Sequence, residues 1–160
     1  MVFKKILVPY DESAYSKRAL EIAAQYADEV KNTQIIVLHV VPVLPVPAMY
    51  LGTARSTKTG ETTTMAAFLK EVHQEMKIEM AKRLQDLVKK YRLQHPIATK
   101  IVTGSPAEKI LEVAKEETVD LIVMGRAGAT GIGRIVKAMG SVSRVVSEKS
   151  SCPVMLVNKN

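Results

Sequence analysis

The chain contains no tryptophan and a single cysteine, and only 4% of its 160 residues are aromatic. Because Cys152 has no second cysteine to pair with, an internal disulfide is excluded and a reducing compartment, the cytoplasm, is expected. The scarcity of aromatic side chains also leaves no visible platform on which bases could stack. A nucleic-acid partner is therefore disfavoured.

Long hydrophobic runs are missing as well. Apolar stretches such as Ile35 to Leu38 have the length of a strand and are far too short to cross a bilayer, so no membrane association is expected. The first residues lead directly into a strand pattern and do not have the form of a signal peptide. No repeat or long linker divides the chain, and we expect a single domain over residues 1–160.

Basic residues outnumber acidic residues by 23 to 16, which gives a formal net charge of +7. The excess is concentrated near the C-terminus, where Glu148 is the only acid between Gly125 and the end of the chain. A basic segment of this kind favours an anionic ligand or partner through its summed field. The basic residues of this segment are Arg126, Arg134, Lys137, Arg144, Lys149 and Lys159.

Strand patterns alternate with helical patterns along the chain. Alternation of this kind predicts an α/β fold: an open five-stranded parallel sheet, strand order 3-2-1-4-5, with right-handed crossovers and helices on both faces. The order 3-2-1-4-5 is the common one for five strands. The five predicted strands are Phe3 to Val8, Gln34 to Val41, Ile97 to Val102, Val119 to Met124 and Cys152 to Val157.

Local signals mark the boundaries of several helices. Ser13 is expected to cap the helix after the first strand, and Ser105-Pro106-Ala107-Glu108 has the pattern of a capping box. The region from Met49 to Gly60 is polar and is interpreted as a loop. An amphipathic helix is predicted from Phe68 to Tyr91.

Two segments converge where this topology is expected to bind a ligand. In such sheets ligands bind beyond the carboxyl ends of the strands, where the strand order reverses, here between the first and fourth strands. Asp11 follows the first strand, and a glycine-rich segment from Gly125 to Gly133 follows the fourth. The last helix is expected to begin at Gly140-Ser141, and its first turn contains no acid, so its N–H groups and dipole are available to phosphate.

Other nucleotide-binding motifs are absent. No lysine followed by serine or threonine comes after the glycines, so the segment is not a P-loop. No glycine-rich turn follows the first strand, which a dinucleotide-binding fold would need. None of His39, His73 and His95 is expected at the switch point, although His39 is close to the end of its strand. Efficient catalysis is therefore not supported, and slow ATP hydrolysis stays open.

Several short motifs occur in the same order as in the universal stress protein family, and the chain resembles that family over essentially its whole length. Members that bind ATP carry Gly-x2-Gly-x9-Gly-Ser/Thr after the fourth strand; Gly125, Gly128 and Gly140-Ser141 match, but eleven residues replace the nine. A two-residue insertion near Gly131-Ile132-Gly133 explains the difference. The motifs are Ile6 to Ser13, Leu38 to Pro42, Gly104 to Pro106, Val123 to Gly125, Gly140 to Ser143 and Cys152 to Val154.

The resemblance implies a site for ATP, or for ADP or AMP, in which Asp11 faces the ribose or adenine and backbone groups of Val40 and Met124 face the adenine edge. The first turn of the last helix would donate to the phosphates, with Mg²⁺ held through them if it is present. The implied site residues are Pro9, Tyr10, Asp11, Val40, Met124, Gly125, Arg126, Gly128, Gly140, Ser141, Val142 and Ser143.

The resemblance further implies a homodimer in which the last strand, Val154 to Val157, pairs with its counterpart. A nucleotide-binding stress-response or regulatory protein is the leading interpretation. One alternative is a dimeric interaction module of this fold that has lost tight ATP binding. A third is a nucleotide-processing enzyme such as an adenylyltransferase; it would carry His-x-Gly-His after the first strand, where the chain has Pro9-Tyr10-Asp11.

Overall fold

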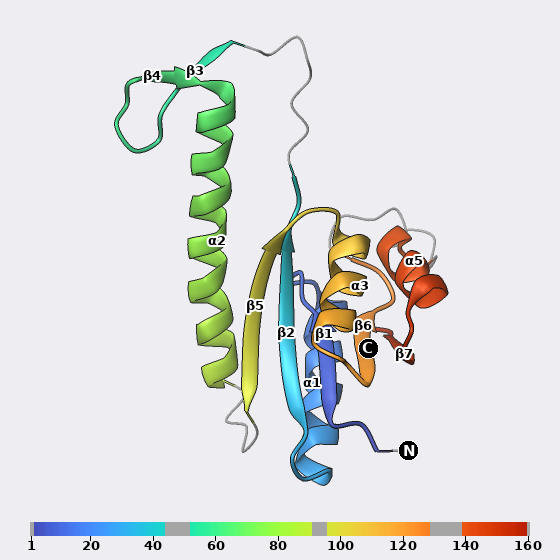
Figure 1. Ribbon diagram of the computed structural model, residues 1–160. Helices are drawn as coiled ribbons and strands as arrows, with labels where there is room; N and C mark the ends of the chain where they lie inside the picture. Colours follow the sequence, from blue (N-terminus) through green and yellow to red (C-terminus); the bar gives the residue numbers. More distant parts are fainter. Residues whose placement is uncertain (1, 44–51, 91–95, 129–138, 160) are drawn as a thin grey trace.

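Five parallel strands in the order β5-β2-β1-β6-β7 form the central sheet of the computed structural model (Figure 1). The structure describes residues 2–43, 52–90, 96–128 and 139–159. Counted along the chain without the small hairpin β3–β4, this order is the predicted 3-2-1-4-5, and the α/β fold is confirmed. The strands are β1 (Lys5–Pro9), β2 (Gln34–Val41), β5 (Ile97–Thr103), β6 (Leu121–Gly125) and β7 (Val154–Val157).

The strand order reverses at β1, which lies between β2 and β6. On one side its register runs from Lys5 opposite Gln34 to Pro9 opposite Leu38. On the other side Leu7 lies opposite Ile122. Crossovers leave β1 in one direction and β6 in the other, so the two strand ends leave an opening between them, as the predicted switch point requires.

Helices lie on both faces of the sheet (Figure 1). Alternate residues of β1 point to opposite faces: Ile6 packs in the cluster that includes α1 residues and Leu84 of α2, and Leu7 packs with residues of α3 and α5. Both side chains are fully buried. The helices are α1 (Ala14–Glu29), α2 (Met65–Lys90), α3 (Pro106–Glu116) and α5 (Ser141–Lys149). Within the described ranges, no helix has the length and apolar character needed to cross a membrane.

The two predicted helix caps have different outcomes. Ser13 caps α1 as expected, its Oγ accepting the N–H of Ser16 at 3.1 Å. The prediction of a capping box at Ser105 is wrong, because the Ser105 side chain makes no cap hydrogen bond. Pro106 starts the helix instead, and the backbone carbonyl of Ser105 accepts the N–H of Lys109 at 2.9 Å.

The segment interpreted as a polar loop, Met49 to Gly60, contributes the first strand and the turn of a small antiparallel hairpin. Its strands are β3 (Thr53–Arg55) and β4 (Thr62–Thr64), which leads directly into α2 at Met65. Threonine is favoured in strands, and Gly60 has φ +72° in the connecting turn, a backbone conformation that suits glycine. Figure 1 shows this hairpin at the N-terminal end of α2, beyond the carboxyl ends of the sheet strands.

Glu71 of α2 fastens the hairpin to the helix. The Ser56 hydroxyl donates to Glu71 Oε2 at 2.8 Å, and the N–H of Thr57 donates to the same oxygen at 3.0 Å. Hydrogen bonding from Ser56, more than any other factor, lowers the pKa of Glu71 below its usual 4.5. The attachment therefore depends on the ionised carboxylate.

We expect acid to loosen the hairpin. Since the pKa of Glu71 is lower in the folded protein, its stabilising contribution is full above pH 4.5 and is lost as the pH falls through the lowered value. Amide hydrogen exchange should show weaker protection of Ser56 and Gly60 in Glu71→Ala than in the parent at neutral pH. In acid the amide protection of the two proteins should become equal. Equal protection already at neutral pH would contradict the role of the Glu71 carboxylate.

Candidate functional site

A cavity of about 390 Å³ opens at the carboxyl ends of β1, β2 and β6, on the face covered by α3 and α5. Its walls come from the loop after β1, the ends of β2 and β6, the start of α3 and the start of α5. The lining residues are Pro9, Tyr10, Asp11, Ser13, Ser16, Leu38, His39, Val40, Pro42, Pro106, Ile110, Met124, Gly125, Ala127, Gly128, Gly140, Ser141, Val142 and Ser143.

The structure brings together every predicted site residue except Arg126. Residues from the β1 end, the β2 end, the turn after β6 and the first turn of α5 all line the same cavity, although up to 134 positions separate Pro9 from Ser143 in the sequence. The suspected insertion at Gly131-Ile132-Gly133 lies outside the described residues.

One lip of the cavity carries Asp11. Its Oδ1 accepts the N–H of Ser13 at 3.1 Å, and its own N–H donates to Ser16 Oγ at 3.3 Å, so the start of α1 fixes the carboxylate. A Cβ placed on Gly128 would lie 3.0 Å from Asp11 Oδ2. A side chain at position 128 would therefore push this carboxylate away, which is a physical reason for glycine there.

The turn after β6 and the N-terminus of α5 form the opposite lip. The carbonyl oxygen of Arg126 accepts two hydrogen bonds, from the N–H of Gly140 at 2.9 Å and from Ser143 Oγ at 2.7 Å. Ser143 is buried, and its hydroxyl also lies 2.9 Å from the carbonyl oxygen of Gly140. The Ser143 hydroxyl, expected to donate to phosphate, therefore braces the two segments against each other.

For Arg126 and Gly125 the structure shows contacts that the sequence did not predict. The guanidinium of Arg126 does not line the cavity; its Nη1 lies 3.5 Å from Asn158 Oδ1, beyond the end of β7. A Cβ on Gly125 would lie 2.6 Å from Tyr15 Cβ. Glycine at position 125 thus lets α1 pack closely on β6, in addition to lining the cavity.

The cavity combines features suited to a ligand with an apolar part, hydroxyl groups and negative charge. Leu38, Val40, Ile110 and Met124 supply apolar wall. The ionised carboxylate of Asp11 can only accept hydrogen bonds, so it suits hydroxyl donors. The first turn of α5 contains no acidic residue and presents N–H groups without intrahelical acceptors, which attract an anion.

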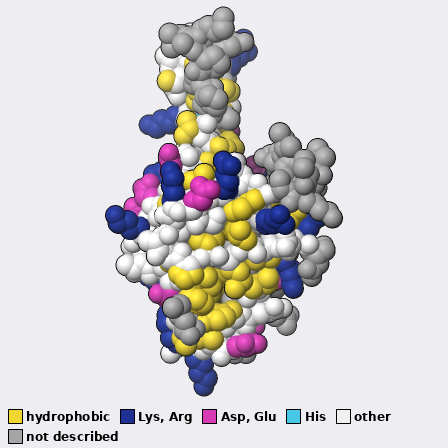
Figure 2. All heavy atoms as spheres, turned by 90° about the vertical axis from the view of Figure 1, so that its right-hand side faces the viewer, with side chains coloured by type: hydrophobic (Ala, Val, Ile, Leu, Met, Phe, Trp, Pro, Cys, Tyr) yellow, Lys and Arg dark blue, Asp and Glu magenta, His cyan; other side chains and the backbone are white. Residues whose placement is uncertain are grey.

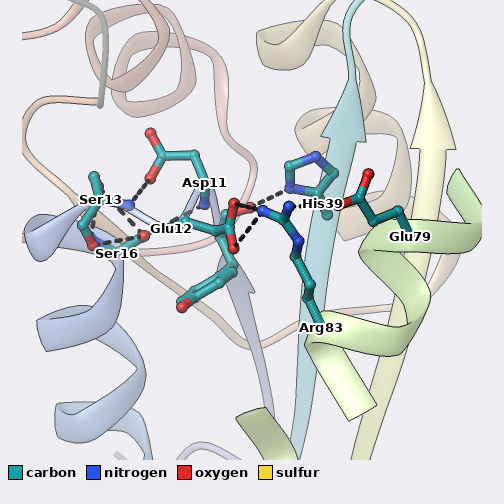
Figure 3. Close-up of polar contacts among 8 residues, drawn as sticks. Asp11, Glu12, Ser13, Ser16, His39, Glu79 and Arg83 are labelled. Atoms are coloured by element: carbon teal, nitrogen blue, oxygen red, sulfur yellow. Dashed lines mark hydrogen bonds and ion pairs between the residues drawn. The ribbon is translucent and has the colours of Figure 1, made fainter. Parts of the chain in front are cut away.

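Sequence reasoning missed His39, Ser13 and Ser16 as lining residues. His39 was expected away from the switch point, yet it lines the cavity, and its Nδ1 lies 2.8 Å from the carbonyl oxygen of Tyr10 (Figure 3). Its position next to Val40 near the end of β2 is the signal that could have placed it. Among the described residues no group of three or more His, Cys, Asp or Glu could hold a metal ion.

Comparison with known proteins gives one family over nearly the whole chain. The model of the universal stress protein family matches residues 2–158. Universal stress protein YxiE of Bacillus subtilis (strain 168) is 35% identical over 157 residues, which are 98% of this chain and 99% of YxiE. These matches include both lips of the cavity.

Solved structures share the architecture. The structure of MJ0577 from Methanocaldococcus jannaschii matches with a TM-score of 0.79 and 27% sequence identity. The match covers 100% of this chain and 99% of the MJ0577 chain. A universal stress protein crystallised in complex with cAMP has a TM-score of 0.65 and 22% identity, with both chains covered completely. The chain belongs to the universal stress protein family.

Proposed function

We propose that this protein binds an adenine nucleotide, ATP foremost, and acts in the cytoplasm as a regulatory or stress-response dimer. The observation that carries the proposal is the cavity itself. Asp11 stands on one lip, and the acid-free first turn of α5, braced on the Arg126 carbonyl, stands on the other. A carboxylate that accepts from sugar hydroxyls thus lies near N–H groups that can donate to phosphates.

In this proposal each part of the nucleotide has its own wall. The adenine ring lies against the apolar ends of β2 and β6, where backbone groups of Val40 and Met124 reach its edge. The ribose hydroxyls donate to Asp11, and the phosphates accept from the N–H groups of Ser141 and Val142. The solved structure with cAMP contains another adenine nucleotide in a protein of this fold, which supports the ligand class; ADP and AMP fit the same walls.

Magnesium fits as a companion of the phosphates. Asp11 is the only carboxylate among the lining residues. Mg²⁺ commonly keeps several waters and binds through one or two carboxylates together with substrate phosphates. The ion would therefore be held by phosphate oxygens and water, with Asp11 within the same cavity.

The proposed role is binding and not rapid catalysis. An efficient hydrolase needs a nucleophile or base aimed at the reacting atom. His39, the one histidine among the lining residues, has its Nδ1 against a backbone carbonyl instead of a serine hydroxyl. Slow ATP hydrolysis is compatible with this arrangement.

The proposed dimer uses the edge strand β7. On one side β7 pairs with β6, from Val154 opposite Ile122 to Val157 opposite Gly125, and it lies at the end of the strand order. Met155 is 42% exposed on this strand. Figure 2 shows hydrophobic side chains gathered on the side of the molecule where β7 and α5 lie. Pairing between two copies would cover both the apolar surface and the unpaired strand edge.

Gly140→Val tests the phosphate part of the proposal. A Cβ at this position would have only ordinary contacts, the nearest atoms at 3.4 Å, and the φ of −66° suits any residue, so the fold should persist. The added side chain would occupy the approach to the α5 N–H groups. Calorimetric titration with ATP should show binding by the parent and none by the variant.

Gly52→Ala provides the matched control, because a Cβ there meets nothing within 4 Å and the position is remote from the cavity. This control should bind ATP like the parent. Undiminished affinity in Gly140→Val would overturn the phosphate assignment. No binding by the parent would favour the interaction module that has lost tight ATP binding.

Asp11→Ala tests the sugar contact. Loss of a charged hydrogen-bond acceptor should weaken ATP binding by about 1 to 3 kcal/mol, or roughly 5- to 150-fold in Kd. Asp86→Ala removes a 70% exposed carboxylate of α2 outside the cavity and should leave the calorimetric Kd unchanged. Equal affinity of Asp11→Ala and the parent would show that the carboxylate does not face the sugar.

Met155→Asp tests the dimer. A carboxylate on each copy would bring like charges together and leave them desolvated in the proposed interface. Analytical ultracentrifugation should give a dimer for the parent and a monomer for this variant. Met76→Asp, which alters a 37% exposed methionine of α2, should remain dimeric. A monomeric parent, or a dimeric Met155→Asp, would exclude this interface.

A further inference from the structure

The loop that carries Asp11 is held by β2, through a residue that also lines the cavity, and by α2, which contributes no lining residue. The Nδ1–H of His39 on β2 donates to the carbonyl oxygen of Tyr10 at 2.8 Å. Arg83 of α2 donates through Nη1 to Glu12 Oε2 at 3.1 Å. Figure 3 shows both contacts reaching the residues that flank Asp11. The loop around Asp11 thus has one contact in the cavity wall, from His39, and one outside it, from Arg83.

Glu12 is the residue of this loop that most needs an external contact. Its φ is +63°, in the left-handed region that costs a residue with a side chain roughly 1–2 kcal/mol. Glu12 lies between Asp11 and the cap residue Ser13. A return of Glu12 to ordinary dihedrals would therefore swing the Asp11 carboxylate away from its place beside Gly128, where a Cβ would lie only 3.0 Å from Asp11 Oδ2.

Arg83 is well placed to hold Glu12. Its second nitrogen, Nη2, lies 2.5 Å from Glu79 Oε1, one turn earlier on α2, so the guanidinium is fixed on its own helix. The hydrogen bond with Glu79 is the main cause that raises the pKa of Arg83, and its charge is permanent at any physiological pH. Both the arginine and Glu12 are partly exposed, at 52% and 42%, so the contact is modest in strength.

We propose that Arg83 is a positioning residue for the nucleotide site, acting through Glu12 to keep the Asp11 carboxylate in its binding orientation. The inference rests on the proposed function. It couples the site to α2, whose other end carries the β3–β4 hairpin (Figure 1). A partner or contact that displaces α2 would then change nucleotide affinity without touching the cavity.

The first experiment compares two variants of α2 by calorimetric titration with ATP. Arg83→Gln should weaken binding about two- to fivefold, since an exposed ion pair has a small effect. Lys89→Gln removes the Lys89–Asp86 pair, which lies on the same helix and does not reach the loop, and should leave the Kd unchanged. Equal affinity of Arg83→Gln and the parent overturns the positioning role.

The second experiment exchanges the charges. Glu12→Lys and Arg83→Glu should each weaken ATP binding, because each removes the attraction between loop and helix. In the double variant the lysine at position 12 can pair with the glutamate at position 83 and with Glu79. The attraction between loop and helix is then restored, so the ATP affinity should return to within about twofold of the parent. A merely structural role would lower thermal stability in the single variants without this recovery of affinity.

The two proposals fail in distinguishable ways. A parent protein that does not bind ATP overturns the nucleotide site and the positioning role together. A parent that binds ATP, with additive losses in the charge-exchanged pair, overturns only the role of Arg83.

Discussion

The carbonyl oxygen of Arg126 is the point on which the site depends. It accepts both the N–H of Gly140 and the hydroxyl of Ser143, and so joins the turn after β6 to the first turn of α5. Together with the packing of Val146 in the core, this brace sets the distance of the helix N-terminus from Asp11. Anion binding by a helix terminus needs N–H groups that are already oriented, because ordering them on binding would cost free energy.

The sheet supplies the rigidity behind this brace. Ile6, Leu7 and Val8 are fully buried on alternating faces of β1, and the strand is paired on both sides. The loop after β1 is therefore anchored at one end by a central, buried strand and at the other by the Ser13 cap of α1. Within this loop Asp11 is held by Ser13 and Ser16 of the helix start, and Glu12, with its left-handed backbone, is held by Arg83.

Much of this could be predicted from sequence, because the signals are local. The α/β class followed from alternating patterns and the strand order from the common topology of five strands, while Asp11, Gly128 and Gly140 followed from their places at strand and helix ends. Other features depend on contacts between distant residues. Glu12 and Arg83 are 71 positions apart, and the reason for glycine at 125 is the approach of Tyr15. Arg126 was expected to line the ligand and Ser143 to donate to phosphate, since sequence does not show that Asn158 and a backbone carbonyl are their partners.

The spacing of the glycines is the departure from the family pattern that most directly bears on phosphate binding. Eleven residues separate Gly128 from Gly140, yet both glycines line the cavity. The N–H of Gly140 also donates a hydrogen bond to the carbonyl oxygen of Arg126. Residues 129–138 lie outside the described part of the chain, but the two ends of this segment are joined by that hydrogen bond. Such a hydrogen bond contributes about 1 kcal/mol, and the bond from Ser143 to the same oxygen supports it. The N–H groups of the first α5 turn that would receive a phosphate are therefore held beside the turn after β6, although the glycine spacing departs from the family pattern.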